Sequence, residues 1–202
     1  MATELSGLAK REGVSGIILL GDIKHRVGAI TKQEWDDIPF FLKSLAAISQ
    51  VYLVPGNHDG NIRHLVPQEV SMTGSKGMVI GDTLFVHGHA MPSELRSHVH
   101  RIVMGHIHPV FLKTGSVIYG ERVWIHIKAK KEALFSEPGL VDIVVVPSFN
   151  QYLYASGSKS YRKSISPIIS RLMSSPENIQ DCIAAALDGS IVGDSEVLQS
   201  IV

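Results

Sequence analysis

The sequence predicts an α/β fold built from two sheets with helices outside them. In the first half, apolar runs of strand length alternate with helical patterns and end in polar loops, an order typical of parallel strands. In the second half, short apolar runs separated by glycine-containing turns predict a region rich in strands. Since ligands of open α/β sheets bind at the carboxyl ends of strands, these polar loops are the expected place for a site.

The first half contains four predicted elements. Residues 2–12 have apolar side chains at helical spacing, and Gly13 is the expected end of that helix. Short apolar runs predict buried strands over residues 16–20 and 50–54. Between them, residues 33–49 predict a helix, despite a proline at position 39. Its apolar stripe comprises Trp35, Ile38, Phe41, Leu42 and Leu45.

The second half contains predicted hairpins and a last helix. Residues 77–80 and 83–86 flank Gly81-Asp82, and residues 116–119 and 122–127 flank Gly120-Glu121, which predicts two hairpins. Further strands are predicted over residues 101–104 and 141–146. Residues 150–166 are polar and irregular. Ser175-Pro176 has the pattern of a helix start, and that helix is expected to run through Leu187 to Gly189, with Cys182 as a small core residue.

The composition is that of an ordinary globular protein. The 202 residues predict one domain over residues 1–202, with residues 150–202 as a C-terminal extension packing on it. Lys+Arg and Asp+Glu are both 19, so the chain lacks the basic excess of a typical nucleic-acid-binding protein. The single cysteine excludes an intrachain disulfide. No secretory signal or run of about 18 apolar residues is found, which favours a cytoplasmic location without a membrane partner.

Four segments, each just past a predicted strand, offer metal-binding side chains. They are Gly21-Asp22-Ile23-Lys24-His25, Gly56-Asn57-His58-Asp59, His87-Gly88-His89 and Gly105-His106-Ile107-His108. Asp, Asn and His suit manganese, iron, zinc or nickel ions. Each segment alone has an ordinary explanation as a turn, a polar strand end or a chance His-x-His pair. Their joint occurrence after four strands favours a metal site.

The order of these segments resembles that of the calcineurin-like metallophosphoesterases, over most of residues 15–150. The segments 56–59 and 105–108 carry the most specific part of the resemblance. Residues 21–25, 106–109 and 146–150 resemble small prokaryotic members, some of which are nuclease-like phosphodiesterases associated with DNA repair. The resemblance implies the two-sheet α/β sandwich of that family and a site of two divalent ions, with manganese expected first.

The resemblance also assigns a role to each site residue. It implies that the Asp22 carboxylate bridges both ions. Asn57, His87 and His106 would bind the second ion, and His108 would bind the first. His58 and Asp59 are the implied catalytic residues. His58 would face the phosphate and protonate the leaving oxygen, and Asp59 would orient it. Two ions about 3.5–4 Å apart neutralise a phosphodiester and activate a water molecule.

One motif of the family is missing. An Asp-x-His at the end of the first strand should supply two ligands to the first ion, yet neither Asp nor His precedes Asp22. We expect the chain to lack that first strand, either because Met1 is an internal start or because the motif was lost. The second site should then bind an ion and the first should be weak or empty, unless His25 or His89 substitutes. An exposed sheet edge would favour a homo-oligomer.

The remaining candidates have ordinary explanations. Four histidines are expected at the surface or in packing, namely His64, His98, His100 and His126. Two basic groups could contact a nucleic-acid backbone but are better explained as solvated loops, namely Lys159, Tyr161, Arg162 and Lys163, and Arg122, Lys128, Lys130 and Lys131. Met91 and Met104 are expected to pack in a core.

The sequence therefore predicts a metal-dependent phosphoester hydrolase, most simply a phosphodiesterase of nuclease-like type. The expected partner is a phosphoester substrate, with nucleic acid as one candidate. The alternatives are a phosphomonoesterase, such as a protein phosphatase or nucleotidase, and a metal-binding but catalytically silent fragment. A structural domain without metal would require four accidental ligand segments.

Overall fold

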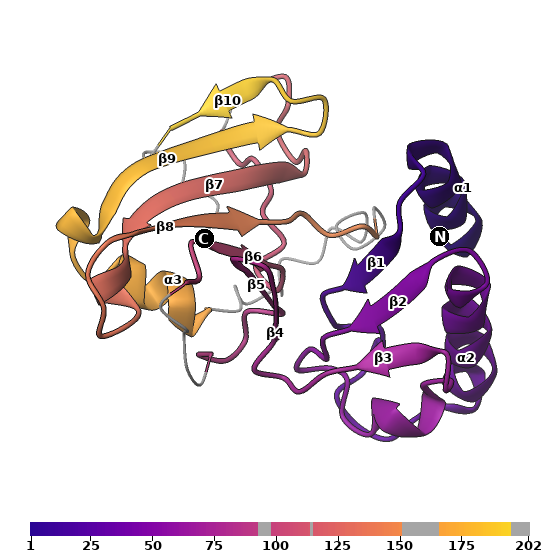
Figure 1. The fold of residues 1–202 in the computed structure, drawn as a ribbon. Helices are drawn as coiled ribbons and strands as arrows, with labels where there is room; N and C mark the ends of the chain where they lie inside the picture. Colours follow the sequence, from indigo (N-terminus) through magenta and orange to yellow (C-terminus); the bar gives the residue numbers. More distant parts are fainter. Residues whose placement is uncertain (93–97, 114, 151–165, 195–202) are drawn as a thin grey trace. The chain divides into compact units, whose positions relative to one another are not determined.

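The computed structural model describes residues 1–92, 98–113, 115–150 and 166–194. The chain divides into two compact units, Met1–Met78 and Val79–Val202, and each contains one sheet and one hydrophobic core (Figure 1). The mixed α/β class with two sheets and flanking helices is confirmed. The single domain over residues 1–202, with its extension over residues 150–202, stays a prediction.

The first unit is a three-stranded parallel sheet with two helices. Its strands lie in the order β1-β2-β3, and β1 and β3 both pair parallel with β2. All the elements predicted here are confirmed, whereas the three-residue strand β3 was not predicted because it is short and follows polar residues. The elements are α1 (Ala2–Glu12), β1 (Gly16–Leu19), α2 (Lys32–Ala46), β2 (Gln50–Leu53), the 3-10 helix Ile62–Leu65 and β3 (Val70–Met72).

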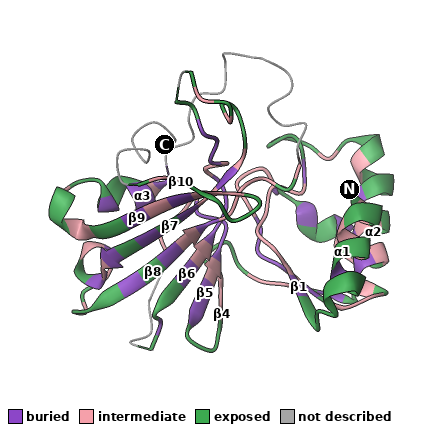
Figure 2. Cartoon of the chain, turned by 90° about the horizontal axis from the view of Figure 1, so that it is seen from above, coloured by how far each residue is buried: buried purple, intermediate pink, exposed green. Residues whose placement is uncertain are grey.

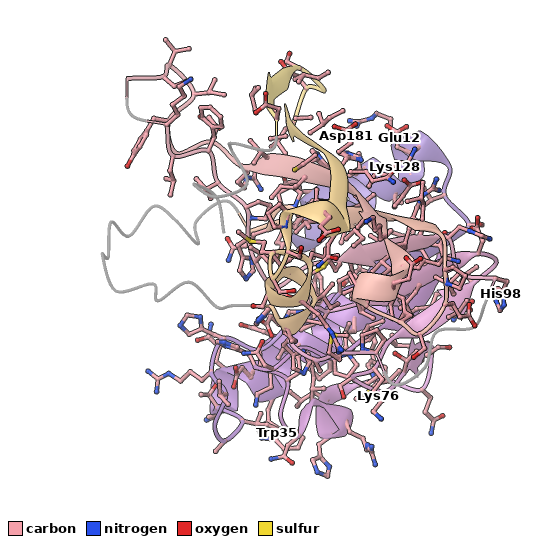
Figure 3. All side chains as sticks on the ribbon, turned by 90° about the vertical axis from the view of Figure 1, so that its left-hand side faces the viewer. Glu12, Trp35, Lys76, His98, Lys128 and Asp181 are labelled. Atoms are coloured by element: carbon pink, nitrogen blue, oxygen red, sulfur yellow. The ribbon has the colours of Figure 1, made fainter. Side chains whose placement is uncertain are left out.

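The core of the first unit forms where α2 packs on the sheet. Leu42 and Leu45 of α2 and Val51 and Leu53 of β2 are completely buried. Ile38 is also buried, and Phe41 packs against this cluster, so most of the predicted stripe faces the core. Trp35, in the first turn of the helix, is half-exposed instead (Figure 3).

The second unit is a seven-stranded mixed sheet in the order β10-β9-β7-β8-β6-β5-β4. Strands β5, β6 and β8 are parallel, and β7 pairs antiparallel with both β8 and β9. Its strands are β4 (Met78–Ile80), β5 (Thr83–Val86), β6 (Arg101–Met104), β7 (Val123–Lys130), β8 (Leu140–Val145), β9 (Ile179–Ala186) and β10 (Ile191–Gly193). Its described residues also form two 3-10 helices, Lys131–Ala133 and Pro176–Asn178, and helix α3 (Pro167–Leu172).

Alternation along the strands builds the core of the second unit. Every second residue of β7 from Val123 to Ala129 is buried, and so are Val141, Ile143 and Val145 of β8 (Figure 2). Helix α3 contributes Ile168, Ile169 and Leu172 to the same cluster. Met104 is buried and Met91 packs against the cluster, as expected.

Among the described residues, no helix has the length and apolar character needed to cross a bilayer.

The predicted strand over residues 116–119 is wrong, because this segment forms turns. The hydroxyl of Ser116 accepts a hydrogen bond from Ile118 N at 3.3 Å, which favours a turn over an extended chain. Val117 is fully exposed, so its apolar side chain has no face to cover. The strand that precedes β7 in this hairpin is reduced to a single antiparallel bridge between Val110 and Arg122.

The predicted helix over residues 176–187 is also wrong. Ser175-Pro176 starts only a 3-10 turn, after which the chain forms β9. The segment pairs along almost the whole of β7, and this long-range pairing overrides the helical tendency of its alanines. Gly189 lies at a φ of 89° between β9 and β10 rather than at a helix end. Cys182 is buried, as expected, although it lies on a strand.

The environment of Cys182 predicts an unreactive thiol. Burial above all, together with the nearby carboxylates of Asp181 and Asp194, raises the pKa of Cys182 to about 11. We expect Cys182 to react with a disulfide reagent at neutral pH only after unfolding by urea. Because the folded thiol ionises at a higher pH than an unfolded thiol, its contribution to stability should be lost as the pH rises from about 9 towards 11. Rapid labelling of the native protein would contradict this description of β9.

Candidate functional site

In the first unit, two predicted site segments follow neighbouring parallel strands. Asp22 follows β1, and Asn57, His58 and Asp59 follow β2. Gly21 and Asp22 both have positive φ angles, 80° and 55°, which turn the chain sharply after β1. A left-handed conformation at a residue other than glycine costs about 1–3 kcal/mol and persists only where the surroundings fix it. The conformation of Asp22 is therefore expected to depend on contacts with its surroundings.

The Asp59 carboxylate supplies that fixation. It is buried, and its Oδ2 accepts hydrogen bonds from Asp22 N at 2.7 Å and Gly56 N at 2.8 Å, while Oδ1 accepts one from Lys24 N at 3.0 Å. A Cβ on Gly56 would lie 2.6 Å from Asp22 N, so only glycine allows this approach. One carboxylate thus joins the loop after β1 to the loop after β2.

His58 is held through its main chain and its ring. Its backbone N donates to Asp22 Oδ1 at 3.0 Å, and its ring Nδ1 lies 2.9 Å from the carbonyl oxygen of His25. Because a carbonyl only accepts, Nδ1 carries the proton, and the neutral ring has its lone pair on Nε2. We expected Asp59 to orient His58, but the carboxylate fixes backbone instead. The part of Asp59 in a reaction stays a prediction.

Sequence analysis missed two residues that support these loops. Lys24 is buried, and its Nζ donates to Gly28 O at 2.9 Å and Gly60 O at 2.7 Å, which joins the same two loops. Nothing in its sequence context distinguishes it from a surface lysine. Glu34 forms a capping box with Thr31 at the start of α2 and also accepts a hydrogen bond from His25 N at 3.2 Å. The Thr-x-x-Glu spacing could have revealed this residue.

In the second unit, the site histidines follow strands β5 and β6. His87 and His106 are both buried, and His87 Nε2 lies 3.1 Å from His106 Nδ1. Two imidazoles that bind one ion at 2.0–2.1 Å place their nitrogens roughly 2.9–3.4 Å apart, so this pair fits a shared ion as well as a direct hydrogen bond. The ring centroid of His89 lies 5.2 Å from the ring centroid of His87 and 6.1 Å from that of His106.

Backbone strain and a distant serine shape this histidine cluster. His106 and His108 have φ angles of 70° and 51°, the same left-handed conformation as Asp22. Gly88 has a φ of 111°, and a Cβ there would lie 2.7 Å from Met104 Cε. The hydroxyl of Ser166, which is completely buried, donates to Gly88 O at 2.7 Å. The start of α3 thus fixes the loop between His87 and His89, which the sequence did not indicate.

The basic residues and histidines that were expected outside the metal site have structural roles or lie at the surface where the structure describes them. Arg122 donates from Nη1 to Ser148 O at 2.7 Å and Phe149 O at 3.1 Å, so it supports the segment after β8 instead of lying in a solvated loop. Lys128 and Lys130 lie on β7 (Figure 3 labels Lys128), and Lys131 is buried. The four histidines expected outside the site, at 64, 98, 100 and 126, are exposed. Lys159, Tyr161, Arg162 and Lys163 lie outside the described residues.

Comparisons with known proteins give a family and similar solved structures. A model of the calcineurin-like phosphoesterases matches residues 2–146. The crystal structure of the Pseudomonas putida nuclease MPE is similar to 75% of this chain and 66% of that chain, with 20% sequence identity and a TM-score of 0.49. The sequence has no significant match among curated proteins.

Removal of the Asp59 carboxylate tests its part in the first unit. Asp59→Ala leaves three buried or half-buried N–H groups without their acceptor, so we expect the free energy of unfolding to fall by about 2–4 kcal/mol. Urea unfolding measures this. The matched control is Asp37→Ala, because Asp37 is exposed and accepts a bond from Gln33 within α2. Equal stability of the two variants would show that the Asp59 bonds do not fix the loops.

Proposed function

This chain belongs to the calcineurin-like phosphoesterase family, and we propose that it hydrolyses phosphodiesters with divalent metal ions, as a nuclease-like enzyme. The observation that carries this proposal is the placement of the family's ligand motifs. In both units they lie in loops at the carboxyl ends of parallel strands, and three of the proposed ligand residues, Asp22, His106 and His108, have positive φ angles. Open α/β sheets generally bind their ligands in such loops.

The side chains present suit divalent ions. The proposed set combines one carboxylate, one amide oxygen and three imidazoles, from Asp22, Asn57, His87, His106 and His108. The 3.1 Å separation of the His87 and His106 nitrogens supports their binding to one ion. The family pattern, rather than the geometry, assigns the donors of both units to one centre. Manganese is the ion we expect first, and iron, zinc or nickel would suit the same donors.

When bound, the metal ions neutralise the phosphate and activate a water molecule. The chain's own residues do the rest. Asp59 fixes the backbone of Asp22, and the Gly88 loop is held by Ser166. His58 faces the phosphate in this proposal, and its doubly protonated ring gives the proton on Nε2 to the leaving oxygen. After that transfer, the ring keeps its proton on Nδ1, which is the tautomer that the His25 carbonyl requires.

A diester substrate is favoured by the resemblance of residues 21–25, 106–109 and 146–150 to small nuclease-like members of the family. The zero net charge gives no added support for a long nucleic acid. A short oligonucleotide or a small diester is therefore the substrate class that we propose. A phosphomonoester is the competing substrate, and the same assay measures it.

Hydrolysis with added Mn²⁺ tests the proposal. We expect the protein to hydrolyse bis-p-nitrophenyl phosphate, a diester, faster than p-nitrophenyl phosphate, a monoester. We also expect detectable hydrolysis of a thymidine dinucleotide. His58→Ala should lower hydrolysis of the dinucleotide about 10²–10⁴-fold, because an alkoxide leaves only with a proton. The control is His126→Ala, since His126 is exposed on β7. Faster monoester hydrolysis would favour a phosphomonoesterase, and no turnover by the folded protein would favour the silent form.

Metal binding is tested separately from activity. We expect about one Mn²⁺ per chain by equilibrium dialysis, because the sequence lacks the Asp-x-His pair that would complete the first site. A bound ion at 100 times its dissociation constant stabilises the folded protein by about 2.7 kcal/mol, so a chelator should lower the unfolding temperature. His87→Ala should abolish this shift, whereas His100→Ala, at an exposed position, should keep it. A chelator without effect on wild-type protein would count against the metal site.

A further inference from the structure

The ring of His58 is oriented by a chain of hydrogen bonds that begins on a helix. Glu34 Oε1 accepts a hydrogen bond from His25 N at 3.2 Å, and His25 O accepts one from His58 Nδ1 at 2.9 Å. Both bonds involve the backbone of one residue, so the position of the His25 carbonyl depends on the Glu34 carboxylate. The identity of the side chain at position 25 plays no part in either bond.

The Glu34 carboxylate is itself fixed. Its Oε2 accepts hydrogen bonds from Thr31 N at 2.8 Å and Thr31 Oγ1 at 3.0 Å, and its backbone N donates to Thr31 Oγ1 at 3.2 Å. These bonds, above all the one from the Thr31 backbone, hold the pKa of Glu34 below its usual range, with smaller contributions from His25 N and from the charge of Lys24. Glu34 is therefore an anionic acceptor on a regular helix, which is a rigid support for a neighbouring loop.

The loop that carries His25 needs such a support. Residues 25–29 are all exposed, so packing does not fix this part of the chain. Two hydrogen bonds of Lys24 anchor the loop at residues 24 and 28. Its backbone N donates to Asp59 Oδ1, and its Nζ donates to Gly28 O. Between these anchors, the bond from His25 N to Glu34 is the contact that sets the direction of the peptide units on either side of His25.

We propose that Glu34 is a positioning residue for His58, acting through the main chain of His25. This inference rests on the proposed function, because the orientation of the ring matters for catalysis only if His58 protonates the leaving oxygen. With Glu34 in place, the ring keeps its proton on Nδ1 and presents Nε2. Without it, the His25 carbonyl is free to rotate away, and the ring loses both its fixed tautomer and its fixed angle.

Two variants separate positioning from helix capping. Glu34→Ala removes the acceptor for His25 N and the capping box together. Thr31→Ala removes the side-chain cap of α2 but keeps the Glu34 Oε1 acceptor for His25 N. Both variants loosen the first turn of α2, so a difference between them reports the bond to His25. Should Glu34→Ala fail to fold, Glu34→Gln keeps a side chain that can cap the helix and is measured in the same way.

The first readout does not need activity. Long-range nitrogen–proton NMR spectra, recorded above the pH range in which histidine titrates, report the tautomer of each ring. The His58 signals are assigned by their loss in His58→Gln. We expect the Nδ1–H tautomer in the wild-type protein and in Thr31→Ala, and a mixture of tautomers in Glu34→Ala. An unchanged Nδ1–H tautomer in Glu34→Ala would overturn the proposal.

The second readout uses leaving groups. A p-nitrophenolate leaves without a proton, whereas the sugar alkoxide of a dinucleotide needs one, so a misplaced acid slows only the second reaction. We expect Glu34→Ala to lower kcat for the dinucleotide about tenfold with KM unchanged, and for bis-p-nitrophenyl phosphate by less than about twofold. Equal losses on both substrates would overturn the proposal. If the wild-type protein hydrolyses neither substrate, the proposed function has failed. The tautomer of His58 measured by NMR then decides alone whether Glu34 positions the His58 ring.

Discussion

The buried carboxylate of Asp59 is the interaction on which the candidate site of the first unit depends. A buried charge is costly unless hydrogen bonds satisfy it, and here three backbone N–H groups do so. Those donors come from two loops that are more than thirty residues apart in sequence, so one side chain sets the distance between them. The left-handed conformation of Asp22 is sustained by the bond that its own N–H donates to this carboxylate.

In the second unit, a neutral hydroxyl instead of a carboxylate fixes the loop that carries the site residues. The strained residues His106 and His108 follow β6, and the loop between His87 and His89 contains Gly88, whose φ of 111° is a conformation that other residues rarely adopt. The anchor of this loop is the Ser166 hydroxyl, which comes from the start of α3. In each unit, strained ligand residues are therefore accompanied by a buried polar group that serves the backbone rather than an ion, and metal affinity should depend on both kinds of residue.

The sequence predicted most of what comes from local pattern and little of what comes from distant pairing. The strands before the site and the residues Asp22, Asn57, His87 and His106 are readable because an apolar run ending in a glycine-containing polar turn is a local signal. Strand β9 was mistaken for a helix because its pairing with β7 is fixed some fifty residues away. The supports Lys24, Arg122 and Ser166 were missed for the same reason, since each acts on the backbone of another segment.

The direction of the strands explains why the proposed chemistry uses only part of the chain. Asp22 and Asn57 follow β1 and β2, and His87 and His106 follow β5 and β6, and in both pairs the strands are parallel. Parallel neighbours place their carboxyl ends at one edge, so consecutive loops can bring side chains together there. The antiparallel strands β7 and β9 alternate in direction and cannot do this. They supply core residues such as Ile127 and Cys182 instead, while His126 on β7 stays exposed and takes no part in the cluster.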